Sequence, residues 1–87
     1  MISLTMPAPS GEELKKARLA AGLSQAEAAE LMGIPIQVGS RGGVQSRTWQ
    51  ALESPTDRRQ MQGSAFVLFL LLTGQHLDFE LVNKRMI

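Results

Sequence analysis

Apolar residues recur at helical spacing soon after an N-terminal arm, residues 1–9, whose two prolines predict a loose, non-helical segment. Ser10 suits the N-cap of a helix, and the two glutamates that follow would lie in its first turn, where negative charge is favourable. Leu14 and Ala17 then share one face, and Gly22 ends the pattern. The pattern predicts a first helix over residues 11–21.

A second helical pattern begins directly afterwards. Ser24 and Glu27 are three residues apart, which is the spacing of a capping box. Alanine or methionine recurs on one side at positions 28, 29 and 32, and Gly33 ends the pattern. We therefore predict a second short helix whose small inner residues let another helix approach closely.

Residues 34–45 interrupt the helical pattern. Pro35 and three glycines exclude a stable helix there. Two short arms, residues 36–38 and 44–46, alternate in polarity around the sequence GSRGG. This arrangement predicts a hairpin-like excursion.

The remaining chain predicts two or three further helices. A third spans about residues 46–54, with Trp49 and Leu52 facing inward, and a fourth, over about 63–73, is uniformly apolar and therefore expected at the centre of the core. Its apolar run is seven residues long, whereas a membrane span needs about 20. The tail, residues 76–87, fits a short helix or an edge strand, and we favour the helix.

Together these elements predict an all-α fold of four or five helices, with a short β-hairpin inserted between the second and third. The domain would span residues 10–75, and the apolar tail with the fourth helix is our candidate for a dimer interface. A hydrophobic content of 44% and a charged content of 20% are ordinary for a globular chain. The N-terminus lacks the pattern of a signal peptide.

Composition also limits the chemistry. Without cysteine, the chain has no disulfide, thiol chemistry or cysteine-ligated zinc site. His76 is the only histidine, and no nucleophile, metal-ligand or phosphate-loop pattern accompanies it. We therefore expect no enzymatic activity, no metal and no cofactor. The net charge of +1 says little about partners, because a DNA-binding face shows its charge locally.

Two segments carry a family resemblance. Residues 18–33, RLAAGLSQAEAAELMG, resemble the first two helices of the Xre or Cro/cI-type helix-turn-helix family, and residues 46–53, SRTWQALE, resemble its recognition helix. The region from RRQM to LLTGQ is similar to the fourth-helix region of small phage- or prophage-encoded regulators. The resemblance covers about residues 10–75 and implies a compact lambda-repressor-like domain.

In function, the resemblance implies a cytoplasmic, sequence-specific transcriptional regulator. Such a protein would repress a small operon by binding double-stranded DNA at a pseudo-palindromic operator as a homodimer, since two short reading helices restore the selectivity that one lacks. The resemblance also implies a partly buried ion pair between Arg18 and Glu53.

We expect the DNA-contacting residues at the start of the second helix, in the excursion and on the third helix. They are Ser24, Gln25, Arg41, Gln45, Ser46, Arg47, Thr48, Gln50 and Ala51. Arg47 would bind a guanine edge or a phosphate, and Gln50 an adenine edge. Ala51 would touch a thymine methyl group, and Gln25 would present its amide to a phosphate at a helix N-terminus.

One departure from the family concerns the connection between the second and third helices. Family members use about four residues there, whereas this chain has twelve, between Gly33 and Ser46. If these residues fold back on themselves, Arg41 becomes an additional phosphate or minor-groove contact.

Other readings of the same residues stay open. Arg41, Arg47 and Gln50 also fit an ordinary solvated surface. Leu31 and the apolar tail favour a protein-interaction module, such as the antitoxin of a toxin–antitoxin pair whose tail wraps a partner protein. Neighbouring genes or a co-purifying second chain would distinguish the two functions.

Overall fold

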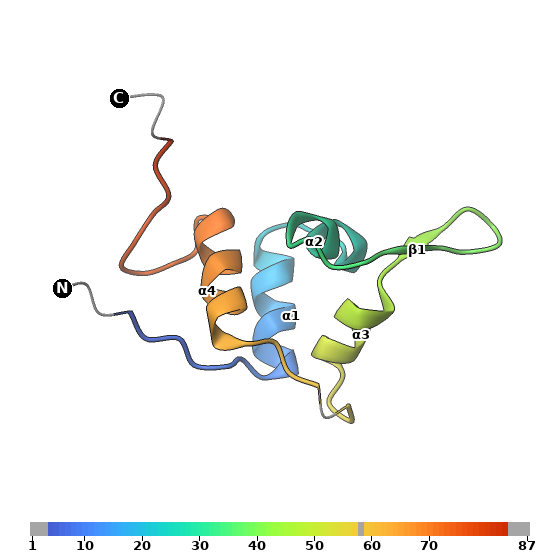
Figure 1. The fold of residues 1–87 in the computed structure, drawn as a ribbon, viewed down its shortest axis with the longest axis horizontal. Coiled ribbons are helices and arrows are strands. Elements are labelled where there is room, and N and C mark those ends of the chain that lie inside the picture. Colours follow the sequence, from blue (N-terminus) through green and yellow to red (C-terminus); the bar gives the residue numbers. More distant parts are fainter. Residues whose placement is uncertain (1–3, 58, 84–87) are drawn as a thin grey trace.

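The computed structural model describes residues 4–57 and 59–83. Figure 1 shows its elements in chain order: α1 (Gly11–Ala20), α2 (Gln25–Leu31), β1 (Gln37–Val38), β2 (Val44–Gln45), α3 (Arg47–Glu53) and α4 (Gly63–Leu72). The four helices and the excursion between α2 and α3 lie close to their predicted positions.

The predicted all-α fold class is wrong. β1 and β2 form a two-stranded antiparallel sheet in which Gln37 pairs with Gln45 and Val38 with Val44, so the fold combines helices with a β-hairpin. The prolines and glycines of this segment prevent it from continuing a helix, and its backbone groups pair across the hairpin instead. An all-helical lambda-repressor-like domain therefore does not describe this chain.

The first two helices begin as their capping residues predict. Ser10 and Ser24 each accept a hydrogen bond from the backbone N–H three residues later, and the glutamate there accepts one from the serine N–H. The N-cap predicted at Ser10 and the capping box predicted at Ser24 are both present, and Ser10 also forms a complete capping box.

The core lies where α1, α2 and α3 meet the inner side of α4. Leu14, Ala28, Ala29, Trp49 and Phe69 are all fully buried there. The ring centroids of Trp49 and Phe69 are 5.6 Å apart, which ties α4 to the centre of α3.

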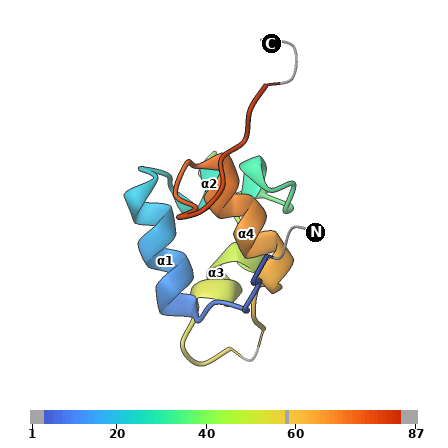
Figure 2. The ribbon, with the colours of Figure 1, turned by 90° about the vertical axis from the view of Figure 1, so that its left-hand side faces the viewer.

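Helix α4 covers one side of this core and is not central to it, as Figure 2 shows. Val67 and Phe69 are its buried residues, whereas Leu68 and Leu72 are 45% and 42% exposed. The expectation of a central helix is wrong because the rest of the domain packs against only one side of α4.

The described parts of the N-terminal arm and of the tail lie at the α4 end of the molecule, opposite the hairpin (Figure 1). The described part of the tail, up to residue 83, forms neither the favoured helix nor a strand, and its last four residues lie outside the described residues. The side chain of His76 instead accepts hydrogen bonds from the backbone N–H groups of Asp78 and Phe79. These two backbone N–H groups therefore bond to a side chain and not to the carbonyl oxygens that a helix would use.

The N-terminal arm is not entirely loose. Pro9 is buried, and its carbonyl oxygen accepts a hydrogen bond from the Gln60 side chain at 2.9 Å. A side chain at Gly63 would collide with the backbone carbonyl of Met6, so glycine allows the arm to cross the start of α4. None of the helices in residues 4–57 and 59–83 combines the length and apolar character needed to cross a bilayer.

Candidate nucleic-acid interface

The carboxylate of Glu53 holds α3 against α1. Arg18 on α1 donates from Nε to Oε2 of Glu53 at 2.6 Å and from Nη2 to Oε1 at 3.1 Å. The two side chains are 10% and 5% exposed, so this two-pronged ion pair is largely withdrawn from water. The ion pair implied by the family resemblance is present.

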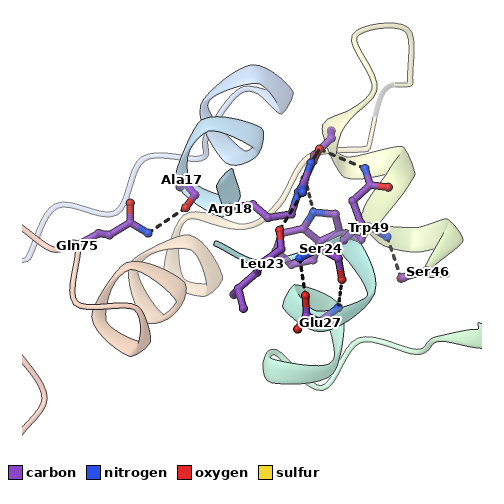
Figure 3. A network of polar contacts seen from close by, with 10 residues as sticks. Ala17, Arg18, Leu23, Ser24, Glu27, Ser46, Trp49 and Gln75 are labelled. Carbon is purple, nitrogen blue, oxygen red and sulfur yellow. Dashed lines mark hydrogen bonds and ion pairs between the residues drawn. The ribbon is translucent and has the colours of Figure 1, made fainter. Parts of the chain in front are cut away.

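Further donors complete the surroundings of the ion pair, as Figure 3 shows. The indole N–H of Trp49 donates to Oε2 of Glu53, and the Gln25 amide donates to Oε1 at 3.2 Å. Arg18 also donates from Nη1 to the carbonyl of Leu23 at 3.0 Å. One carboxylate thus joins α1, the start of α2 and the inner side of α3.

These contacts set the protonation of Glu53. Burial raises the pKa of the carboxyl, but hydrogen bonds from Arg18, Trp49 and Gln25, together with the charge of Arg18, outweigh burial and lower the pKa below its ordinary value. The carboxylate is therefore stabilised as an anion within the fold.

The outer face of α3 carries two of the predicted DNA contacts. Arg47 and Gln50 are exposed and lie three residues apart, which places them on one face of the helix. Trp49 is buried on the opposite side. Ala51, one turn after Arg47, is only 7% exposed, so the burial of this residue does not support its predicted contact with a thymine methyl group.

Ser46 at the start of α3 was also predicted to contact DNA, but it is buried. It is fully buried and caps α3, because its hydroxyl accepts from the N–H of Trp49 at 3.1 Å and donates to the carbonyl of Pro35 at 2.9 Å. With its hydroxyl committed on both sides, Ser46 cannot also contact DNA. Thr48, which was also predicted to contact DNA, is half-buried.

The start of α2 presents less to a ligand than the resemblance implies. Ser24 is exposed, but its hydroxyl accepts the backbone N–H of Glu27. The amide nitrogen of Gln25 is occupied by Glu53 and the residue is half-buried. The bond to Glu53 uses one of the two N–H donors of this amide, so the predicted phosphate contact of Gln25 would depend on the other.

The hairpin projects away from the helices beyond the start of α3 (Figure 1). Arg41 is exposed at its tip, whereas Gln45 is half-buried at its base. The Gln37 side chain accepts a hydrogen bond from the backbone N–H of Arg47 at 3.0 Å. Sequence reasoning missed this role of Gln37, because nothing in the local pattern connects a glutamine in the excursion with a helix ten residues later.

The charge of this region is one-sided. Residues 31–52 contain two arginines, Arg41 and Arg47, and no aspartate or glutamate. Neither arginine side chain takes part in an ion pair with any residue that the structure describes. The next carboxylate along the chain, Glu53, is turned inward onto Arg18. The hairpin and α3 therefore form one surface with an uncompensated positive charge, which we call the cationic end.

Within the described residues, no group of three or more histidine, aspartate or glutamate side chains is placed to hold a metal ion. The cationic end thus offers arginine guanidinium groups and a glutamine amide as its binding chemistry. Such groups recognise phosphates and base edges. Comparison with known protein families, with curated proteins and with solved structures finds no match to this chain.

Proposed function

We propose that this chain is a sequence-specific DNA-binding transcriptional regulator that reads the major groove with the outer face of α3. The observation that carries the proposal is the division of α3 into two sides. Arg47 and Gln50 are exposed on one side, while Trp49 packs the other side into the core. A short, firmly held helix with free arginine and glutamine side chains suits the reading of base edges.

The Glu53 network supports this role by making α3 rigid. Side chains that discriminate between bases must be held close to one geometry by the structure behind them. Here the ion pair with Arg18 and the bond from Trp49 bind the last residue of α3 to α1 and to its own inner side. The reading side chains therefore project from a scaffold whose position the ion pair restrains.

A homodimer on a pseudo-palindromic operator is part of the proposal. One seven-residue helix can contact only a few base pairs, and a second copy doubles the number read. The exposed leucines of α4 and the exposed apolar residues of the tail supply an uncovered apolar surface at the end opposite the hairpin. A stable interface buries about 800 Å² on each partner, so both the helix and the tail would take part.

The family resemblance of residues 18–33 and 46–53 adds that the regulator represses a small operon from the cytoplasm, where the DNA lies. The matching segments cover the end of α1, all of α2 and all of α3. The hairpin between them is this chain's own departure from the family pattern.

The test is an electrophoretic shift assay with the DNA upstream of the protein's own gene, titrated with salt. We expect binding that weakens steeply with salt and discriminates against scrambled DNA. Arg47→Ala should weaken specific binding by about 1–3 kcal/mol and relax the preference at one base pair. Lys16→Ala is the matched control, because Lys16 is an exposed cation on α1 and leaves the cationic end intact.

Two results would count against the proposal. Equal loss for Arg47→Ala and Lys16→Ala would mean that only overall charge matters. An Arg47→Ala variant that binds its DNA as tightly as the unaltered protein would remove α3 from the interface.

A second candidate function, a protein-interaction module such as an antitoxin, rests on the tail. Leu77, Phe79, Leu81 and Val82 are all exposed and belong to no helix or strand. An extended apolar segment of this kind can add itself to a partner's groove or sheet edge. Stable co-purification of a second protein encoded beside this one, lost when residues 77–82 are replaced by serine, would favour this candidate.

A further inference from the structure

We infer that the β1–β2 hairpin is a second DNA-reading element, whose tip places Arg41 in the minor groove beside the major groove occupied by α3. This inference rests on the proposed function and adds to it. It predicts a preference for A·T-rich DNA at one flank of each half-site, because such DNA has a narrow minor groove with a strong negative potential.

The first support is that the hairpin is fixed to α3. Gln37, in β1, accepts the backbone N–H of Arg47 at 3.0 Å. Ser46, between β2 and α3, donates its hydroxyl to the carbonyl of Pro35 at 2.9 Å. The incoming arm of the hairpin is thus bonded twice to the start of α3, and the outgoing arm continues directly into the helix. The position of the helix in a groove would therefore also fix the direction of the hairpin.

The second support is the geometry of the tip. The N–H of Gly39 donates to the carbonyl of Gly43 at 2.6 Å, and the N–H of Gly42 donates to the carbonyl of Gly39 at 2.9 Å. Gly42 has φ of 83°, a conformation that residues with side chains rarely adopt. These bonds close a tight turn in which Ser40 and Arg41 lie outermost.

The reach of the hairpin matches the spacing of the grooves. Arg41 lies four positions before Gln45, and at about 3.3 Å per residue this length of chain reaches at most about 13 Å beyond the start of α3, because residues 39–43 form the turn. The major groove of B-form DNA is about 12 Å wide. With α3 in that groove, the hairpin is therefore long enough to cross one phosphate backbone and arrive at the adjoining minor groove.

The third support is chemical complementarity. Arg41 is exposed, makes no ion pair within the described residues, and lies in a segment with no acidic residue from 31 to 52. Behind it, the cross-strand pair Val38 and Val44 is 71% and 51% exposed. A guanidinium group followed by apolar side chains suits the minor groove, where arginine reads the potential and apolar groups contact the groove walls.

The experiment first selects preferred duplexes from a library with a randomised centre, using the full chain. The selected core is then placed between A·T-rich or G·C-rich flanks, and affinities are measured for the unaltered protein, Arg41→Ala and the control Lys16→Ala. We expect the unaltered protein and the control to prefer the A·T-rich flank by about tenfold. Arg41→Ala should lose this preference and still recognise the core.

Because Arg41 is exposed, the variant is expected to keep its fold, which circular dichroism checks. Equal loss of affinity on both flanks would make Arg41 a simple phosphate contact and overturn the inference. Full retention of the flank preference by Arg41→Ala would overturn it as well. In either case core recognition through Arg47 would survive and so would the proposed function, whereas failure to select any sequence would remove both.

Discussion

At the scale of single residues, Glu53 has the largest structural role in this chain. Its carboxylate accepts hydrogen bonds from Arg18, Trp49 and Gln25, which come from three different helices. A buried ion pair of this kind need not add much net stability compared with an apolar pair, but it is costly to break, because removing one partner leaves the other charge buried without compensation.

Glu53→Ala is therefore expected to lower the free energy of unfolding by about 3–5 kcal/mol, as measured by urea denaturation. Glu12→Ala is the control, because Glu12 is an exposed glutamate with a long contact to Lys16. An unchanged stability for Glu53→Ala would contradict the role assigned to the ion pair.

The same carboxylate predicts a dependence on pH. Because folding lowers the pKa of Glu53, its contribution to stability is complete above its ordinary value of about 4.5 and decreases as the pH falls through the lowered pKa. Acid unfolding should accordingly be less steep in Glu53→Gln than in the unaltered protein. Identical slopes for the two proteins would show that Glu53 titrates alike in the folded and unfolded states.

At the scale of elements, the hairpin and α3 form one unit because Ser46 is both the end of one and the cap of the other. Its buried hydroxyl bonds Pro35 ahead of the hairpin and Trp49 within the helix. The mutual orientation of the two elements therefore depends on a few hydrogen bonds and little on apolar packing, since Val38 and Val44 are exposed.

Ser46→Ala is expected to destabilise the fold by about 1–2 kcal/mol, because it removes a helix cap and the hydrogen bond to the carbonyl of Pro35. Ser40→Ala, at the exposed tip of the hairpin, is the matched control and should have little effect. Thermal denaturation of both variants measures the difference. Equal melting temperatures would mean that the hydroxyl of Ser46 does not couple the hairpin to α3.

At the scale of the whole molecule, the two surfaces of interest lie at opposite ends. The hairpin projects at one end, and α4 lies at the other with the described part of the tail (Figure 1). Helix α4 has no charged residue, although Leu68 and Leu72 face outward. A helix that is apolar all round is normally covered on every side. In the proposed homodimer, a second copy of the chain would cover the exposed side of α4.

Leu68→Asp is accordingly expected to weaken self-association by at least about tenfold, because each copy would bring an unpaired charge into the interface. Sedimentation equilibrium gives the association constant, and circular dichroism checks the fold. Leu19→Asp, which changes an equally exposed leucine on α1, is the control. A dimer that Leu19→Asp disrupts and Leu68→Asp does not would place the interface elsewhere.

Local signals in the sequence were enough to place the helices. The capping serines and closing glycines of α1 and α2, and the proline after α3, act within a few residues of the backbone that they direct. The hairpin was predictable for the same reason, although its strand pairing makes the fold mixed and corrects the all-α class. Arg41, Arg47 and Gln50 were placed on the surface, where the structure has them.

The side of each element that faces the core was harder to predict, because it depends on which other element packs against it. Ala51 and Ser46 were expected to face DNA but are buried, and α4 was expected to be central but is half uncovered. Helical periodicity defines relative positions around an axis, and it does not say how much of that circumference the rest of the chain can cover.

By itself, the sequence determined the approximate boundaries of the helices and the absence of acidic residues from 31 to 52, whereas the family resemblance implied the ion pair of Arg18 and Glu53. Only the tertiary structure decided that Gln25 serves Glu53, that Gln37 receives the first N–H of α3, and that the hairpin projects while α4 stays partly bare. Caps, turns and charge runs follow from neighbouring residues. Contacts between segments 10 to 58 residues apart depend instead on how the whole chain closes around one core.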